Sequence, residues 1–586
     1  MDRPDKPSSR PHRAFLPTYG HAVASKDSHT TGFPRIAPDF ALSRAADVKS
    51  RRWSEEDGFC IVKATRNQGP KPCNDQDPKE VKDIVCQSAA YARLHLSARP
   101  FFLFTVGLLI FGSDFCVAIF NRAGISFSPI KNLWTNTKDF IRIVRRMTRV
   151  MTTTELGQDP SVSILPPEIS NTFNLDGYPS FRYPAIGSDY HEWCTVGRPI
   201  WSSMTLFGRG TMVWNVLEYR EGFTPHLASE KIMKMTWCDP NRSSESEIYQ
   251  SIPRGYPKGL ARFLTGGDVR NSTGQTIAVA SVCNTAYHGT LVLHRVILNT
   301  VGRPLWTYAS ELELLKGMFT AASAHKYSSD QHFIHGDVSP GNILLAKDSE
   351  VTQEDGAGFL IDLESAQLPP NASIEVVEFV PPQKRTRTLM TPPTLRRKLK
   401  FLSGSRPHIE PTGTLLFMAY DLLVAMRDKD DMEQTEEHDI ESFMLVAGYA
   451  VLRKLLENCK DNEEYKLLYV CFRAAFGPTS LDSVILSRRA DAALEWIFNK
   501  SIAHIVERHV SPSVRSLLYH FRNLVKKRRD TMISTINKSK FTLAATMPNS
   551  DAPNPPFKLH HSDLLDSLSI AITQLESEMG QPAVSL

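Results

Sequence analysis

Apolar positions recur at two different spacings along this chain, first in alternation and later at helical intervals. Alternation dominates between about residues 201 and 300, and it predicts strands in MTLFGRGTMVWNVLEY, KIMKMTW, TIAVASV and GTLVLHRVIL. Apolar residues three and four positions apart dominate from ELELLKGMFTAASAHKY to about residue 530 and predict helices. Strands followed by helices predict an α+β protein with a strand-rich lobe and a helical lobe rather than a doubly wound sheet.

A further globular region, residues 81–200, precedes the strand-rich block. IVCQSAAYARLHLSA and TKDFIRIVRRMTRVM predict helices, and PFFLFTVGLLIFGSDFCVAIF predicts two buried strands joined by a Gly-Ser-Asp turn. Ser113 and Asp114 interrupt this last segment, whereas a membrane helix needs about 20 consecutive apolar residues. We therefore expect no contact with a membrane.

Three polar segments lack a sustained period. Residues 1–80 are rich in proline and charge, and we expect them to be mostly disordered, as we expect for the tail at 531–586. The segment 375–410 predicts a basic loop, within which Lys384-Arg385 and a later RRKLK have the spacing of a bipartite nuclear import signal. A solvated insertion explains the same charges.

Composition narrows the class of protein. Hydrophobic residues make up 41% of the 586 positions, enough for large buried cores, and the formal net charge of +5 is too small to argue for nucleic acid. The nine cysteines are scattered, with no Cys-x-x-Cys pair, which favours reduced thiols over disulfides or a zinc site. The start of the chain is polar. We expect an intracellular protein, in the cytoplasm and possibly the nucleus.

The segment FIHGDVSPGNILL carries the first candidate chemistry. Phosphoryl transfer needs bound phosphates, bridging metal ions and a carboxylate that orients the attacking hydroxyl. Asp337 is the candidate base, Asn342 lies five residues later as a candidate metal ligand, and His335 completes the catalytic set. Pro340 and Gly341 tighten the turn between them, whereas the plain alternative is a buried turn with a capping Asp.

A second acidic residue follows in GFLIDLESA. Asp362 ends an apolar run, and a carboxylate at the tip of a buried strand can ligate magnesium together with Asn342.

Candidate ATP-binding residues lie upstream. In alternation, Ile232, Lys234 and Thr236 share one face of a strand, which lets Lys234 reach phosphates, with Glu245 as its expected partner and Glu247 as a rival. A surface lysine is the plain alternative. Gly208 and Gly210 in LFGRGTMVW allow backbone amides to approach phosphate oxygens, although Val213 stands where a third glycine is usual.

The order of these motifs is that of the protein-kinase-like superfamily. PTGTLLFMAYDLL resembles the end of an activation segment, with Asp421 at the Glu of Ala-Pro-Glu. EEHDIESFMLV resembles the start of the central helix of the large lobe, where Asp439 would hold the backbone of the catalytic loop.

With YARLHLSARPFFLFTVGLLIFG, FNRAGISFS, ELGQDPSV and GRPL, these motifs resemble the fungal-type protein kinase domain family over about residues 80–455. The resemblance implies a bilobal kinase fold, with a small lobe at 201–305 and a large lobe at 306–530. It also implies binding of ATP and magnesium and phosphorylation of a protein substrate on Ser or Thr.

Three departures from the kinase pattern stand out. Gly336 replaces the Arg that pairs with a phosphorylated activation loop, so we expect no control through that pairing. Ser339 replaces a Lys, which removes one contact to the γ-phosphate, and Leu363-Glu364 replace Phe-Gly. We expect the segment after Asp362 to flip less readily as a result.

Two alternatives remain open. His-Gly-Asp loops also occur in kinases that phosphorylate aminoglycosides, choline or homoserine, although TGTLLFMAYDLL followed by HDIESF favours a protein substrate. A pseudokinase that binds partners is the non-enzymatic alternative. Neither the identity of the substrate nor the oligomeric state can be inferred from the residues.

Overall fold

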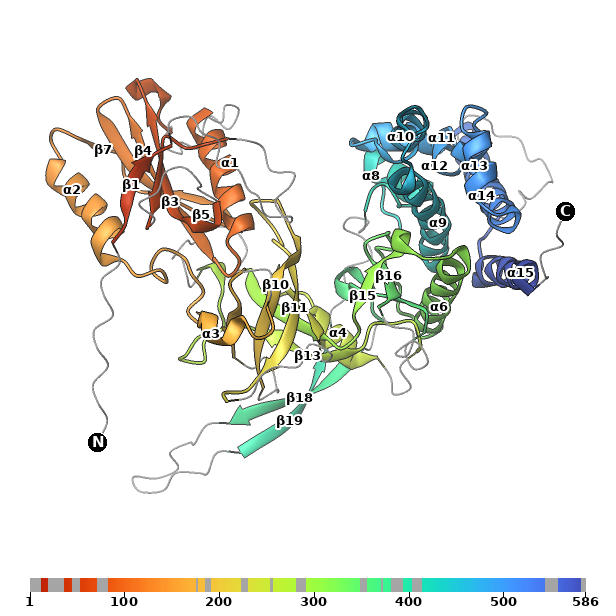
Figure 1. The fold of residues 1–586 in the computed structure, drawn as a ribbon, viewed down its shortest axis with the longest axis horizontal. Coiled ribbons are helices and arrows are strands. Elements are labelled where there is room, and N and C mark those ends of the chain that lie inside the picture. Colours follow the sequence, from red (N-terminus) through yellow and green to blue (C-terminus); the bar gives the residue numbers. More distant parts are fainter. Residues whose placement is uncertain are drawn as a thin grey trace. The chain divides into compact units, whose positions relative to one another are not determined.

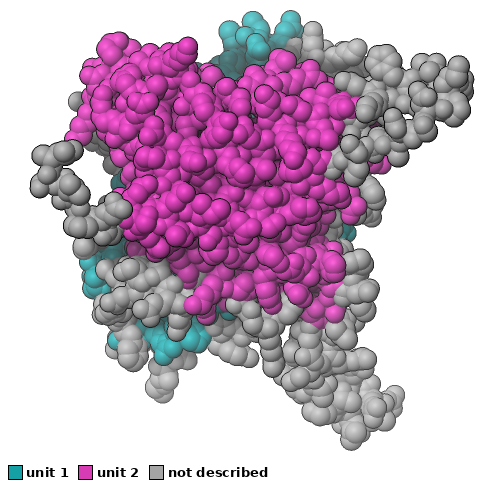
Figure 2. All heavy atoms as spheres, turned by 90° about the vertical axis from the view of Figure 1, so that its right-hand side faces the viewer, with its two compact units in different colours: residues 1–244, 264–299 teal, residues 245–263, 300–586 magenta. Residues whose placement is uncertain are grey.

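The described residues form two compact units, which are coloured separately in Figure 2. Unit 1 comprises residues 1–244 and 264–299, and unit 2 comprises residues 245–263 and 300–586. The structure is a computed structural model. It describes residues 12–18, 36–44, 53–70, 83–174, 178–184, 191–222, 230–252, 257–280, 291–347, 356–369, 372–380, 394–402, 414–542 and 557–580.

Unit 1 begins with a seven-stranded sheet in which β1 to β6 follow in sequence order and β7 pairs with β5. The strands are β1 (Ala14–Pro17), β2 (Phe40–Ser43), β3 (Glu56–Lys63), β4 (Phe104–Phe111), β5 (Asp114–Asn121), β6 (Ile125–Phe127) and β7 (Lys131–Asn132). All neighbouring pairs are antiparallel except β3 and β4.

Alternation along these strands gives the first sheet two apolar faces. One face packs on α1 (Asp83–Ala98) through residues such as Phe59 and Leu109. The other contacts α2 (Thr137–Arg145) through Phe115, and Figure 1 shows α1 and α2 on opposite sides of β3 to β5. The predicted helices and the β4–β5 pair in residues 81–200 are therefore confirmed.

The second sheet of unit 1 contains the expected phosphate-binding strands. Its order is β13-β14-β12-β11-β10-β9-β8. The strands are β8 (Ser163–Ile164), β9 (Phe181–Tyr183), β10 (Glu192–Ser202), β11 (Met212–Tyr219), β12 (Lys231–Cys238), β13 (Phe263–Asp268) and β14 (Val292–Leu298). A short helix, α3 (Pro167–Ser170), lies between β8 and β9 in the sequence.

Two expectations for unit 1 need correction. The described part of residues 1–80 is not disordered: β1, β2 and β3 are short strands whose buried residues complete the first sheet. Each strand is short and is flanked by polar and proline-rich residues, so its apolar pattern is too short to predict a strand from the sequence. The segment TIAVASV is not a strand over its described residues 276–280, where only isolated bridges to Arg270 and Val292 form; residues 281 and 282 lie outside the described part.

Unit 2 is mainly helical, with a three-stranded sheet of order β15-β16-β17. Its strands are β15 (Gly302–Pro304), β16 (Ile343–Ala346) and β17 (Gly358–Leu360). Its helices are α4 (Glu245–Ser251), α6 (Glu311–Asp330), α8 (Tyr420–Asp428), α9 (Glu436–Asn458), α10 (Asn462–Phe476), α11 (Leu481–Arg489), α12 (Ala492–Glu495), α13 (Ala503–His509), α14 (Pro512–Thr542) and α15 (His561–Gly580). Within the described ranges, no helix is both long enough and apolar enough to cross a membrane.

Unit 2 also differs from expectation in two places. The segment 375–410 contains most of an antiparallel hairpin, β18 (Ser373–Val380) and β19 (Thr394–Phe401), rather than a loop; Lys384, Arg385 and the rest of 381–393 lie outside the described residues. The Lys and Arg residues of β19, TLRRKLKF, favour a solvated loop in the sequence, whereas β18, SIEVVEFV, carries apolar residues and no basic ones. The expected disordered tail holds the end of α14 and all of α15.

Asp421, which the kinase resemblance assigns a structural role, is buried at the start of α8. Arg528 of α14 donates to both of its carboxylate oxygens, at 3.1 and 2.7 Å, and to Glu441 of α9 at 2.6 Å. His438 bonds the same carboxylate at 3.0 Å. Burial would raise the pKa of Asp421, but His438 and Arg528 hold it well below its usual range. This network joins α8, α9 and α14.

We expect Arg528→Met to destabilise unit 2 by about 3–5 kcal/mol, because it leaves Asp421 and Glu441 buried without their shared cation. Urea unfolding followed by circular dichroism measures the effect. Arg427→Met is the matched control, because Arg427 pairs with Asp428 at the surface of α8 and its loss should change little. Equal effects of the two substitutions would contradict this assignment.

Candidate functional site

The loop 335–342 joins the end of α6 to β16 and places its polar groups through local hydrogen bonds. His335 faces backbone on both sides of its ring: Nδ1 accepts from the Asp337 N–H at 3.3 Å, and Nε2 donates to the Ile361 carbonyl at 3.0 Å. A backbone N–H only donates and a carbonyl only accepts, so the ring carries its proton on Nε2. His335, which the sequence places in the catalytic set, ties the loop to the residue before Asp362, and its part in catalysis stays a prediction.

Asn342 closes the same loop from its other end. Its Nδ2 donates to the Asp337 carbonyl at 2.8 Å, and its backbone carbonyl accepts from Ile361 N–H at 3.0 Å. The first bond fixes the side-chain amide so that its oxygen points away from that carbonyl. An amide oxygen presented in this way is a suitable ligand for a hard cation.

Thr414 orients the Asp337 carboxylate. Its backbone N–H and its hydroxyl both donate to Oδ1 of Asp337, at 2.8 and 3.0 Å. The sequence contained this threonine within PTGTLLFMAYDLL, but nothing in its residue type marked it as a partner of Asp337. Among the described residues, both of these bonds go to Oδ1, and no hydrogen bond reaches the second carboxylate oxygen, Oδ2.

Asp362 follows β17 in a left-handed backbone conformation, with φ 67° and ψ 71°. Non-glycine residues rarely adopt this conformation, and it concentrates at functional sites. The turn continues into the short helix Leu363–Ser365.

Three carboxylates gather at this turn. Glu245 of α4, Asp362 and Glu364 each offer an oxygen, and these oxygens lie within 4.8 Å of one another. Glu245 is fully buried and accepts from the Leu363 N–H at 3.2 Å. Glu364 stands where the kinase pattern has glycine, so it adds a negative charge that the pattern lacks.

The charges of this region fit a divalent cation. Burial and the Asp362 carboxylate raise the pKa of Asp337, although His335 and Thr414 act in the opposite direction. Two carboxylates that repel each other are stabilised when a cation lies between them. Asp362 and the Asn342 amide oxygen are oxygen ligands of the kind magnesium prefers, and Glu245 and Glu364 add to the negative potential.

Asp439, at the start of α9, holds the backbone just before Asp337. Its Oδ2 accepts from the Gly336 N–H and from Nε2 of His325, both at 3.0 Å. Gln434 donates to the Gly336 carbonyl at 3.0 Å. The role that the resemblance implied for Asp439 matches this geometry, and Gly336 itself has φ 79°, a left-handed conformation that suits glycine.

Lys234 lies in unit 1, in the middle of β12. Its neighbours Met233 and Met235 point into the core of the second sheet, so Lys234 points to the opposite face, together with Ile232 and Thr236, as alternation predicted. The side chain is largely buried. The pairing of Lys234 with Glu245, which belongs to unit 2, stays a prediction, as does its approach to Asp337.

The expected glycine loop connects β10 and β11 in unit 1. Gly208 and Gly210 both have positive φ, 85° and 52°. The loop packs on Arg122 of the first sheet: the Arg122 carbonyl accepts from the Gly208 N–H at 2.9 Å, and a Cβ on Gly210 would lie 2.4 Å from the Arg122 Nε. Burial lowers the pKa of Arg122 to about 10. Sequence reasoning did not single out Arg122, which sits within FNRAGISFS.

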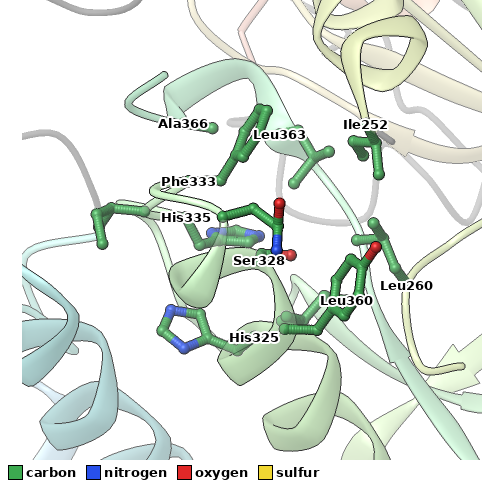
Figure 3. A pocket seen from close by; sticks show the side chains of 12 residues that line it. Ile252, Leu260, His325, Ser328, Phe333, His335, Leu360, Leu363 and Ala366 are labelled. Carbon is green, nitrogen blue, oxygen red and sulfur yellow. The ribbon is translucent and has the colours of Figure 1, made fainter. Parts of the chain in front are cut away.

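An apolar pocket adjoins the catalytic loop within unit 2, as Figure 3 shows. His325, Ser328 and Phe333 line it with Leu360 and Leu363. None of its lining residues is acidic, so the pocket does not include the carboxylates of Asp337, Asp362, Glu245 or Glu364.

A loop that carries Asp337 and Asn342 beside a second acidic turn is the arrangement on which kinases build phosphoryl transfer. The model of the fungal protein kinase family matches residues 37–451. The chain belongs to this family and is therefore a kinase by descent. The match begins earlier than the resemblance we described, and it includes β2 and β3.

Curated proteins give no match to the chain. The solved "Structure of vaccinia related kinase 3" is 11% identical, covering 70% of this chain and 95% of that one, with a TM-score of 0.33. The assignment to the family rests on the match of the family model to residues 37–451.

We expect Asp337→Asn to raise the melting temperature at pH 7 without magnesium. A carboxyl group whose pKa rises on folding favours the folded state only while protonated, and this contribution is lost as the pH rises through the raised pKa. Ionised Asp337 therefore costs stability at neutral pH, while asparagine still offers Thr414 an acceptor. Thermal unfolding from pH 7 down to pH 4 should show the difference shrinking.

Asp330→Asn is the matched control, because Asp330 is exposed and pairs with Lys326 on α6. Magnesium should raise the melting temperature of the unchanged chain more than that of Asp362→Asn. A lower melting temperature for Asp337→Asn at pH 7 would contradict the repulsion between Asp337 and Asp362.

Proposed function

We propose that this protein transfers the γ-phosphoryl group of ATP to Ser or Thr hydroxyls of a protein substrate. The observation that carries the proposal is the Asp337 carboxylate. Thr414 fixes its Oδ1, and within the described residues no hydrogen bond reaches Oδ2. A raised pKa makes it a better proton acceptor than an ordinary aspartate.

Asp337 orients the attacking hydroxyl and accepts its proton, while Asn342 and Asp362 would hold magnesium. The bound ion would supply positive charge that offsets the charge developing on the phosphates. Glu245 and Glu364 lie beside Asp362 and strengthen the negative potential that attracts the ion.

The residues of unit 1 bind the nucleotide in this proposal. Lys234 contacts the α- and β-phosphates, and the backbone of the loop with Gly208 and Gly210 approaches the phosphate oxygens. Ser339 supplies no cation to the γ-phosphate, so magnesium held by Asn342 and Asp362 would have to offset more of that charge.

The test uses the full-length protein with labelled ATP and magnesium. Label should pass to generic protein substrates, and Asp337→Ala should reduce the rate by at least about 100-fold, the lower range for loss of a general base. Nucleotide binding, measured separately by calorimetry, should persist in this variant. Asp330→Ala, which removes an exposed carboxylate of α6, should leave the rate unchanged.

The same assay separates the alternatives. Transfer to aminoglycosides or choline without transfer to protein would overturn the proposal in favour of a small-molecule kinase. Nucleotide binding without transfer to any acceptor would indicate a pseudokinase.

A further inference from the structure

The C-terminal helix α15 packs against the body of unit 2. It lies against α6 and α14, the neighbours that Figure 1 shows beside it. Its buried apolar residues recur at helical spacing: Leu564, Leu568, Ala571 and Leu575. Polar contacts also join it to both helices, between Glu576 and Lys316 at 2.7 Å and between Glu578 and Ser513 at 2.7 Å.

The first residue of α15 reaches the buried group that anchors the catalytic loop. Nε2 of His561 lies 2.8 Å from Nδ1 of His325, and the other nitrogen of His325 lies 3.0 Å from Oδ2 of Asp439. The same oxygen accepts from the Gly336 N–H at 3.0 Å. A continuous set of hydrogen bonds thus runs from the C-terminal helix to the residue before Asp337.

The number of protons shared along these hydrogen bonds explains why the set depends on His561. The pKa of Asp439 is lowered: burial would raise it, but the bonds from His325 and Gly336 outweigh burial, so the group is a carboxylate. Nε2 of His325 therefore carries a proton. Its Nδ1 and the Nε2 of His561 share one further proton between them, and without His561 this buried nitrogen loses its partner.

We propose that His561 is a positioning residue for phosphoryl transfer. It holds the His325 ring, which holds the Asp439 carboxylate against the Gly336 amide and so fixes the backbone that presents Asp337. The expected effect of His561 on the rate of phosphoryl transfer rests on the proposed function. Its expected effect on the backbone at Gly336 does not.

The test compares His561→Ala with His561→Gln in the full-length protein, because the Gln amide places a donor near the position of the imidazole Nε2. His561→Ala should lower kcat by about 2- to 10-fold, the range expected for one net hydrogen bond, with an unchanged KM for ATP. His561→Gln should restore most of kcat. Glu576→Gln, which removes only the negative charge of the outer contact between α15 and Lys316, should behave as the unchanged chain.

Hydrogen exchange of the Gly336 amide gives a readout that needs no activity. Exchange should be faster in His561→Ala and return towards the original rate in His561→Gln. Unchanged exchange in His561→Ala would overturn the inference whatever the enzyme does. The protein could instead transfer no phosphate while exchange of the Gly336 amide still becomes faster in His561→Ala. That result would refute the proposed function and leave the positioning role of His561 intact. Equal losses in His561→Gln and His561→Ala would assign His561 a purely packing role.

Discussion

The carboxylate of Asp439 is the constraint on which the candidate site depends. One buried oxygen accepts from both His325 and the Gly336 amide, and Gln434 holds the carbonyl of the same glycine. Both ends of the Gly336 residue are therefore fixed by α9 and the segment before it. With φ at 79°, an Arg at position 336 would meet backbone strain. This loop is therefore anchored by buried groups from the interior of the unit.

The concentration of negative charge at the candidate site lowers the stability of the folded state. Asp337 and Asp362 repel each other, and Glu245 and Glu364 crowd the same turn. Elsewhere in unit 2 a comparable group of acids is balanced internally, because Arg528 lies between Asp421 and Glu441. The buried cation at Arg528 belongs to a network that joins three helices, whereas the acids around Asp362 lie beside the loop that carries Asp337. A concentration of like charge near a functional loop agrees with the general cost of functional sites to stability.

Much of the site could be predicted because its signals are local. Asp337 and Asn342 lie within one short loop whose turn residues bring them together, and Asp362 ends a strand that is apolar throughout. The alternation of side chains along a strand was enough to predict on which face of β12 Lys234 lies. The larger elements were predictable for the same reason, since β4, β5, α6 and α9 each carry long apolar patterns.

The contacts that complete the site are long-range, and no local pattern reports them. Thr414 lies 77 residues from Asp337, Arg528 lies 107 from Asp421, and His561 lies 236 from His325. Each is an ordinary residue in its own segment: a threonine in a loop, an arginine in a basic helix, a histidine at a helix start. Their roles arise only when burial removes water and leaves one partner for each polar group. A kinase motif therefore points to candidate reacting groups, while the residues that hold them in place become visible only in the folded chain.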